Sequence, residues 1–131
     1  MKEILMKMDQ ESWELIKSGK KTIEIRESKP SNMFYPFRVI VYVHGKKCVV
    51  GKFDVDAIAK SIRPESFVEG SCMTLKEILY RTDEKTICAW YIKSGSVVEY
   101  EIPFSLEEAT GLKKPPISWC YLNRDIENVQ A

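Results

Sequence analysis

The sequence has few of the residues that build metal sites and disulfide frameworks. It contains four cysteines and a single histidine, His44, in 131 residues. The cysteines, Cys48, Cys72, Cys88 and Cys120, are 24, 16 and 32 residues apart and form no C-x-x-C pair. This spacing argues against the usual zinc motifs. We interpret His44, in a His-Gly-Lys stretch typical of a turn, as a solvated residue rather than a general base.

The chain also lacks a charge bias and long apolar runs. Twenty basic and 19 acidic residues give a net charge of +1. The surface as a whole is therefore not expected to attract nucleic acid electrostatically. An anionic partner must be bound by a local basic patch. No apolar run approaches the roughly 20 residues that span a bilayer, and the N-terminus lacks the apolar run of a signal peptide. We expect a cytoplasmic protein with no membrane association, metal, cofactor or structural disulfide.

Length and composition are those of an ordinary globular domain. Apolar residues make up 44% and charged residues 30% of the chain. A chain of this size favours one domain over residues 1–131. We place its core at about 4–122 and a frayed tail at 123–131. Of the cysteines, we expect Cys72 to be exposed and the other three to be small core residues, because they lie in or near apolar runs.

Periodicity and capping signals predict alternating short elements. Asp9 is a candidate helix N-cap and Gly19 a candidate C-terminal residue in the left-handed conformation. Thr74 and Glu77 have the spacing of a capping box. Expected helices cover residues 10–18, 74–81 and 106–109, and expected strands cover 4–8, 22–26, 37–43, 47–58, 86–93, 97–104 and 117–122. We expect 86–93 to pair with 97–104 through a Ser-Gly-Ser turn. The prediction is a small α+β barrel of five to seven strands with two or three short helices.

The most informative stretch is residues 19–26, where a helical pattern changes to a strand. Because strand side chains alternate, the two faces are predicted to carry Thr22, Glu24 and Arg26 on one side and Lys21, Ile23 and Ile25 on the other. The polar face then holds a carboxylate beside a guanidinium, with an ammonium at the start of the strand. This is a compact set for binding a polar ligand. The alternative is an exposed strand face whose charges serve solubility and cross-strand pairing.

The spacing Gly19-x-Lys21-x-x-Glu24-x-Arg26 resembles the G-x-K-x-x-E-x-R signature of the ASCH domain, a small β-barrel family related to PUA domains. Three later stretches resemble the family in the same order. These are Val50-Gly51, the YEIPFSL segment at 100–106, and the PPISWCYL segment at 115–122. The resemblance spans about residues 4–122.

The resemblance implies a PUA-like barrel whose charged strand lines a cleft, with RNA or a modified nucleoside or nucleotide as ligand. The expected ligand-binding residues are Lys20, Lys21, Glu24 and Arg26. Two loop aromatics, Phe34 and Tyr35, extend this set, because they could wall a base-sized cavity and stack on a base. The alternative for them is a lid folded back onto the core.

One branch of the family implies catalysis. Its members are small amidohydrolases that deacetylate N4-acetylcytidine with a lysine, a threonine and a glutamate. The lysine matches Lys21, but the threonine falls at Glu24 and the glutamate at Ser71, with Glu69 two residues further back. Glu24 could instead act as a general base on water, with Lys21 stabilising the oxyanion. The alternative function is thus a hydrolase of an acylated nucleoside, or a ribonuclease. We favour binding, because no complete set of acid, base and nucleophile is readable.

Overall fold

The computed structural model describes residues 2–61, 63–82 and 87–123. The elements, in chain order, are β1 (Lys2–Met8), α1 (Gln10–Ser18), β2 (Ile23–Arg26), β3 (Phe37–Val43), β4 (Cys48–Ser61), the 3-10 helix η1 (Pro64–Phe67), α2 (Val68–Ser71), α3 (Leu75–Thr82), β5 (Ile87–Ile92), β6 (Val98–Phe104), α4 (Leu106–Thr110) and β7 (Trp119–Asn123). Asn123, the first residue of the predicted tail, is instead the last residue of β7 and pairs with Lys2 of β1; the rest of that tail lies outside the described residues.

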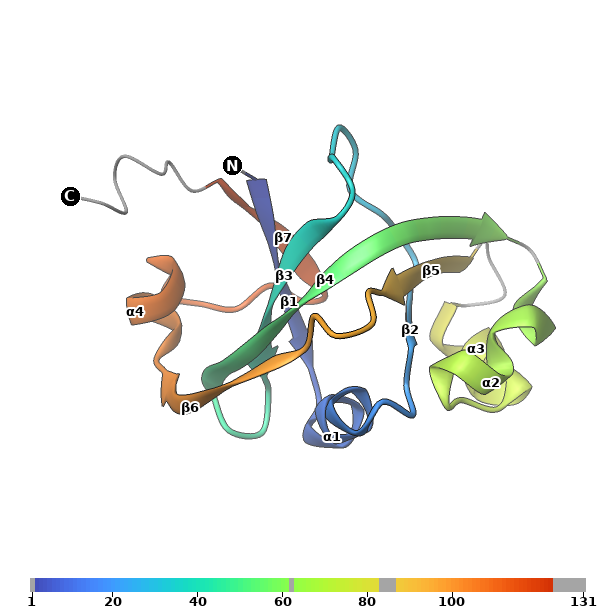
Figure 1. Cartoon of the computed structure of the whole chain (residues 1–131), viewed down its shortest axis with the longest axis horizontal. Helices are drawn as coiled ribbons and strands as arrows, with labels where there is room; N and C mark the ends of the chain where they lie inside the picture. Colours follow the sequence, from blue (N-terminus) through green and yellow to red (C-terminus); the bar gives the residue numbers. More distant parts are fainter. Residues whose placement is uncertain (1, 62, 83–86, 124–131) are drawn as a thin grey trace.

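The seven strands form one mixed, curved sheet (Figure 1). Six strands follow the order β2-β5-β4-β3-β1-β7, and β6 pairs with β4 beside this path. β1 runs parallel to β3 and antiparallel to β7. The predicted α+β class and strand number are confirmed. In the described part of the chain, however, no strand pairing joins β2 to β7, so the barrel stays open on this side.

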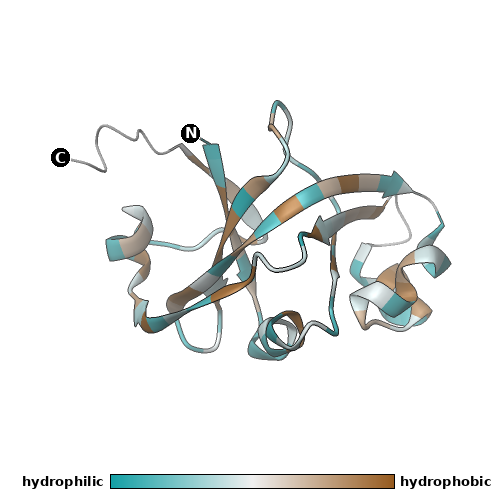
Figure 2. Ribbon diagram, viewed as in Figure 1, coloured by the Kyte–Doolittle hydropathy of each residue, from teal (hydrophilic) through white to brown (hydrophobic). Residues whose placement is uncertain are grey.

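Apolar residues are concentrated on the strands (Figure 2), and both faces of the sheet are covered. Ile4 and Met6 of β1 pack into the largest core cluster together with Trp13 of α1, whereas Leu5 packs with a second cluster that includes Leu106 of α4. β1 is therefore buried on both sides, as expected for a strand with a parallel neighbour. Among the described residues, no helix combines the length and apolar character needed to cross a bilayer.

The predicted caps are confirmed. The Asp9 carboxylate accepts a hydrogen bond from the Ser12 amide at 2.7 Å, and Gly19 ends α1 with φ +83°. The amide of Thr74 donates to the Glu77 carboxylate at 2.9 Å, while the Glu77 amide donates to the Thr74 hydroxyl at 3.1 Å. These local bonds satisfy amides that the first turn of a helix leaves free, which is why sequence spacing alone locates them.

The expected hairpin of β5 with β6 is wrong. β4 has 14 residues, so one of its edges accommodates β5 beside Val55–Ser61 and β6 beside Val49–Lys52. The turn between them is held on β4, because Ser96 Oγ accepts from the Asp54 amide at 2.9 Å. β6 is consequently an edge strand, as Pro103 predicts. Its apolar side chains Ile102 and Phe104 are 75% and 44% exposed.

Gly51 lies in β4 where a side chain has no room. The register against β3 shifts next to the Val41–Gly51 pair, which confirms the predicted irregularity. A Cβ at this position would meet the Val98 carbonyl oxygen and approach Trp13 Cζ2 to 2.7 Å.

We therefore expect Gly51→Ala to lower the free energy of unfolding by about 1–3 kcal/mol, because backbone and a buried ring must shift. Urea denaturation measures this change. Gly45→Ala is the matched control, since a Cβ there meets nothing within 4 Å. Equal stability of the two variants would contradict the packing argument.

Candidate functional site

Three charged side chains meet at β2. Lys21 Nζ lies 3.4 Å from Glu24 Oε1, and Arg26 Nη2 lies 2.9 Å from Glu24 Oε2. Their side chains are 2%, 0% and 4% exposed, respectively. We call these three residues the charged cluster. The solubility interpretation of this strand face is excluded, because the face is buried.

The local sequence explains the arrangement. Ile23 and Ile25 pack into an apolar cluster with Phe67 of η1 and Ile78 of α3, so alternation turns Glu24 and Arg26 to the opposite side. Lys21 precedes β2 and does not follow this alternation. Its ammonium lies beside Glu24, not on the isoleucine side as the pattern predicts.

Lys21 and Arg26 connect the charged cluster to distant segments. Lys21 Nζ donates to the Ser71 carbonyl oxygen at the end of α2 at 2.7 Å. Arg26 Nη1 donates to Ser118 Oγ at 2.9 Å and to the Ser118 carbonyl oxygen at 3.3 Å, and Nη2 donates to the Lys7 carbonyl oxygen at 2.9 Å. Arg26 thus spans the open side of the sheet, from β2 to β1 and the segment before β7.

The charged cluster keeps Glu24 ionised. Burial alone would raise the pKa of the Glu24 carboxyl, but the charges of Arg26, Lys21 and Arg81 lower that pKa to about 2. Burial lowers the pKa of Arg26, opposed by Glu24; an arginine nevertheless stays protonated. Two buried atoms of the charged cluster, Glu24 Oε1 and Arg26 Nε, have no hydrogen-bond partner within the described structure.

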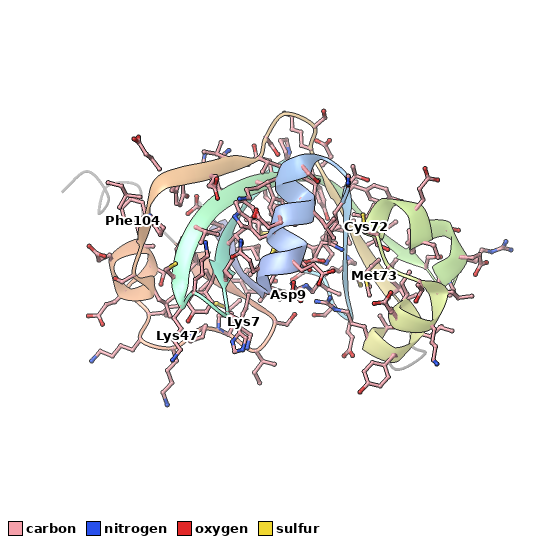
Figure 3. The ribbon with its side chains drawn as sticks, turned by 90° about the horizontal axis from the view of Figure 1, so that it is seen from below. Lys7, Asp9, Lys47, Cys72, Met73 and Phe104 are labelled. Carbon is pink, nitrogen blue, oxygen red and sulfur yellow. The ribbon has the colours of Figure 1, made fainter. Side chains whose placement is uncertain are left out.

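β2 lies between α1 on one side and α2 and α3 on the other, in both views (Figures 1 and 3). Figure 3 shows Asp9, at the start of α1, and Met73, before α3, on opposite sides of the strand. Charged residues on both sides of β2 act on the charged cluster. Asp9 raises the pKa of Arg26 as a minor contribution, and Arg81 of α3 acts on both Glu24 and Arg26.

Comparison with known families identifies the fold. The family model of the ASCH domain matches residues 6–107, well over half of the chain. The chain belongs to the ASCH domain family. A search of curated proteins found no significant match.

Crystal structures of an ASCH protein from Zymomonas mobilis share the fold. The structure of the protein without a stated mutation has 20% sequence identity to this chain and a TM-score of 0.78. The match covers 98% of this chain and 91% of that chain. Two structures of single-residue mutants have 19% identity and a TM-score of 0.79, with 98% of this chain covered and 92% and 94% of theirs. This likeness shows that the chain has the same small α+β fold as the Zymomonas mobilis protein.

The ASCH domain has a pocket beside Lys21. It measures about 320 Å³ and lies between the end of α1, the entry to β2 and the turn before β6. Its basic lining residues are Lys17, Lys21 and Lys93. Lys17 pairs with Glu14 and Glu99 at 2.7 Å each, whereas Lys93 is exposed. No sequence pattern indicated Lys93, because hydrogen bonds of its turn to Asp54 of β4 place it beside the end of α1.

The other predicted site residues lie outside the charged cluster. Lys20 is exposed at the start of the β2 segment, and Glu69 is exposed on α2. In the described part of this ASCH domain, no hydrogen bond or ion pair joins either one to the charged cluster. Phe34 and Tyr35 are 93% and 46% exposed. Tyr35 packs against Phe37 with ring centroids 5.4 Å apart, but Phe34 does not fold back as a lid.

Ser71 and Ser118, which accept hydrogen bonds from the cations of the charged cluster, were not among the predicted site residues. Ser118 stands within the PPISWCYL segment, so the family resemblance carried a signal for it. Ser71 is the position at which the resemblance places the family's glutamate, but here it contributes a main-chain oxygen, which any residue type could supply.

Proposed function

We propose that this ASCH domain binds RNA or a nucleotide-like ligand at the charged cluster. The observation that carries the proposal is that two buried atoms, Glu24 Oε1 and Arg26 Nε, form no hydrogen bond, although Oε1 lies 3.4 Å from the Lys21 ammonium. A buried polar atom without a hydrogen bond costs about 1–3 kcal/mol. A nucleobase edge offers donors and acceptors close together, so an exocyclic amine or a 2′-hydroxyl could donate to Glu24 and a carbonyl oxygen could accept from Arg26.

The basic pocket supports an anionic ligand. Two cations and one carboxylate give the charged cluster an excess of positive charge, and Lys21 also lines the pocket that Lys93 borders. A phosphate in this pocket would meet the exposed ammonium of Lys93, and the attached base would lie on the Lys21 side of the pocket, next to the charged cluster. Charge-assisted hydrogen bonds of this kind are stronger than neutral ones. The ASCH family expectation of RNA as ligand agrees with this chemistry.

Glu24 is poorly suited to be a general base. A pKa of about 2 makes its carboxylate a very weak proton acceptor at neutral pH, whereas efficient bases have a pKa near the working pH. A carboxylate fixed in its charged form is better suited to accepting hydrogen bonds. This difference favours binding over hydrolysis of an acylated nucleoside or of RNA as the function of the charged cluster.

Binding of a fluorescently labelled single-stranded RNA, followed by anisotropy, tests the proposal. We expect Lys21→Met to weaken binding about tenfold, the loss of roughly one charge-assisted contact. Lys93→Met is expected to weaken binding a few-fold and to reduce its salt dependence. Lys113→Met, an exposed lysine after α4, removes the same charge away from the site and should leave the affinity unchanged.

Circular dichroism of each variant separates lost binding from lost folding. Lys93 is exposed, so its variant should fold normally and keeps the test valid if Lys21→Met is unstable. Unchanged affinity in folded Lys21→Met and Lys93→Met would overturn the proposed site. Incubation with N4-acetylcytidine and with the same RNA, against Lys21→Met, tests the hydrolase alternative through loss of the acetyl group or of intact RNA.

A further inference from the structure

A second cavity lies at the loop between β2 and β3, apart from the charged cluster. It measures about 730 Å³, and its lining includes Lys2, Asn32, Phe34, Phe37, Arg38 and Asp54. None of the charged-cluster residues belongs to this lining. The volume lies within the range of about 300–1,000 Å³ that is usual for small-ligand sites. The cavity thus has room for a nucleotide-sized group.

Phe34 is held in an exposed position by a well-anchored loop. Its ring is 93% exposed. On the N-terminal side of the ring, the Ser28 carbonyl oxygen accepts from Trp90 Nε1 at 3.2 Å, and the Ser31 amide donates to the Tyr121 hydroxyl at 2.9 Å. The exposure of the ring is therefore not the result of an unattached segment.

The residues on either side of Phe34 are packed while Phe34 is not. Met33 is half-buried against the core, and Tyr35 contacts the buried ring of Phe37. The loop thus uses its neighbouring apolar side chains for packing and leaves one aromatic face free at the rim of the cavity. A fixed, exposed aromatic ring beside a hollow suits stacking of a planar ligand.

The charges around this cavity favour an anion. Arg38 has a half-exposed side chain and lies 3.4 Å from the buried carboxylate of Glu3. Asp54, the acidic residue of the lining, lies 3.5 Å from Lys52. Lys2 Nζ lies 5.9 Å from the centre of the Tyr121 ring, and no ion pair of Lys2 occurs among the described residues. The two carboxylates are each paired, so the excess charge at the cavity is positive.

We propose that this cavity is a second subsite for single-stranded RNA, in which a base stacks on Phe34 and a neighbouring phosphate meets Lys2 and Arg38. The proposal rests on the proposed function, because it assigns a further part of the same RNA ligand to this cavity. Stacking on Phe34 requires an unpaired base, since a paired base in a duplex has no free face. The cavity should therefore distinguish single strands from duplexes.

The test compares Phe34→Ala with wild type in anisotropy titrations with a labelled single-stranded 12-mer and with the duplex of the same sequence. We expect the variant to bind the single strand at least about fivefold more weakly, the lower limit for one lost stack. Duplex binding, if present, should be unaffected. Ile102→Ala on β6 removes another exposed apolar side chain, 75% exposed, and is expected to bind as wild type does.

The outcomes separate this proposal from the proposed function. Weaker single-strand binding in Phe34→Ala but not in Ile102→Ala supports the second subsite. Full binding by Phe34→Ala, together with lost binding by Lys21→Met, overturns the second subsite and leaves the proposed function in place. Weaker binding by Phe34→Ala together with full binding by Lys21→Met supports the second subsite and overturns the charged cluster as the main site. Because Phe34 is 93% exposed, its removal should not unfold the protein.

Discussion

Replacing Arg26 with methionine is expected to lower the free energy of unfolding by about 3–5 kcal/mol, the usual cost of breaking a buried ion pair from one side. The variant leaves the Glu24 carboxylate, 0% exposed, without its guanidinium partner at 2.9 Å. It also removes the bonds to Ser118 and to the Lys7 carbonyl oxygen across the open side of the sheet. The lost ion pair and the lost hydrogen bonds exist only in the folded state, so both losses lower the free energy of unfolding. Urea denaturation at neutral pH measures the change.

Two further variants show whether this loss comes from the unpaired charge. Arg63→Met removes an exposed arginine and should change stability by about 0.5 kcal/mol or less. The double variant Glu24→Leu/Arg26→Met removes both partners and should be more stable than Arg26→Met alone, because no carboxylate is then buried unpaired. A loss below about 1 kcal/mol in Arg26→Met would contradict the buried-pair description.

Acid should remove about 3 kcal/mol of stability through Glu24 alone. The pKa of this carboxyl falls from its ordinary value of 4.5 to about 2 on folding, so the unfolded chain takes up the proton first. The stabilisation is complete above about pH 4.5 and is lost as the pH falls toward about 2. The size follows from 1.36 kcal/mol per pH unit of pKa difference.

Unfolding free energies measured between pH 2 and pH 6 test this expectation. Wild type should lose stability steeply in this window, and Glu24→Gln should lose about 3 kcal/mol less, because it has no carboxyl at this position to titrate. Glu69→Gln, at an exposed position on α2, is the control and should keep the steep slope. Parallel pH profiles for wild type and Glu24→Gln would show that this carboxyl does not dominate acid unfolding.

Local signals located most elements, because their causes lie within a few residues. Asp9, Gly19 and the Thr74–Glu77 pair fixed helix ends by short-range hydrogen bonds and backbone conformation. Strand partners were harder to predict. Periodicity shows that Val98–Phe104 is a strand, but the choice between β4 and β5 depends on the length of β4 and on the Ser96–Asp54 bond. The parallel pairing of β1 with β3 had no sequence signal.

The site, too, has features that local sequence predicts and features that only the tertiary structure reveals. Alternation correctly placed Glu24 and Arg26 on one side of β2, but it could not show that this side is covered. The covering groups come from distant segments, since Arg26 binds Ser118, 92 residues away, and Lys21 binds Ser71, 50 residues away. Lys21 was misplaced because it precedes the strand, where the two-residue period does not hold. The sequence predicts Phe34 as a loop aromatic that either stacks on a base or folds back as a lid, and only the anchors at Ser28 and Ser31 reveal its fixed exposure.

The edge strand β6 has a consequence for self-association. An exposed edge with apolar side chains such as Ile102 and Phe104 is the kind of surface on which copies of a chain add strand to strand. Pro103, between these two residues, has no amide hydrogen and interrupts the row of donors that an added strand would need. Glu101, exposed on the same strand, would bring carboxylates of two copies together. We therefore expect these two residues to oppose strand addition at β6, although its apolar side chains lie in solvent.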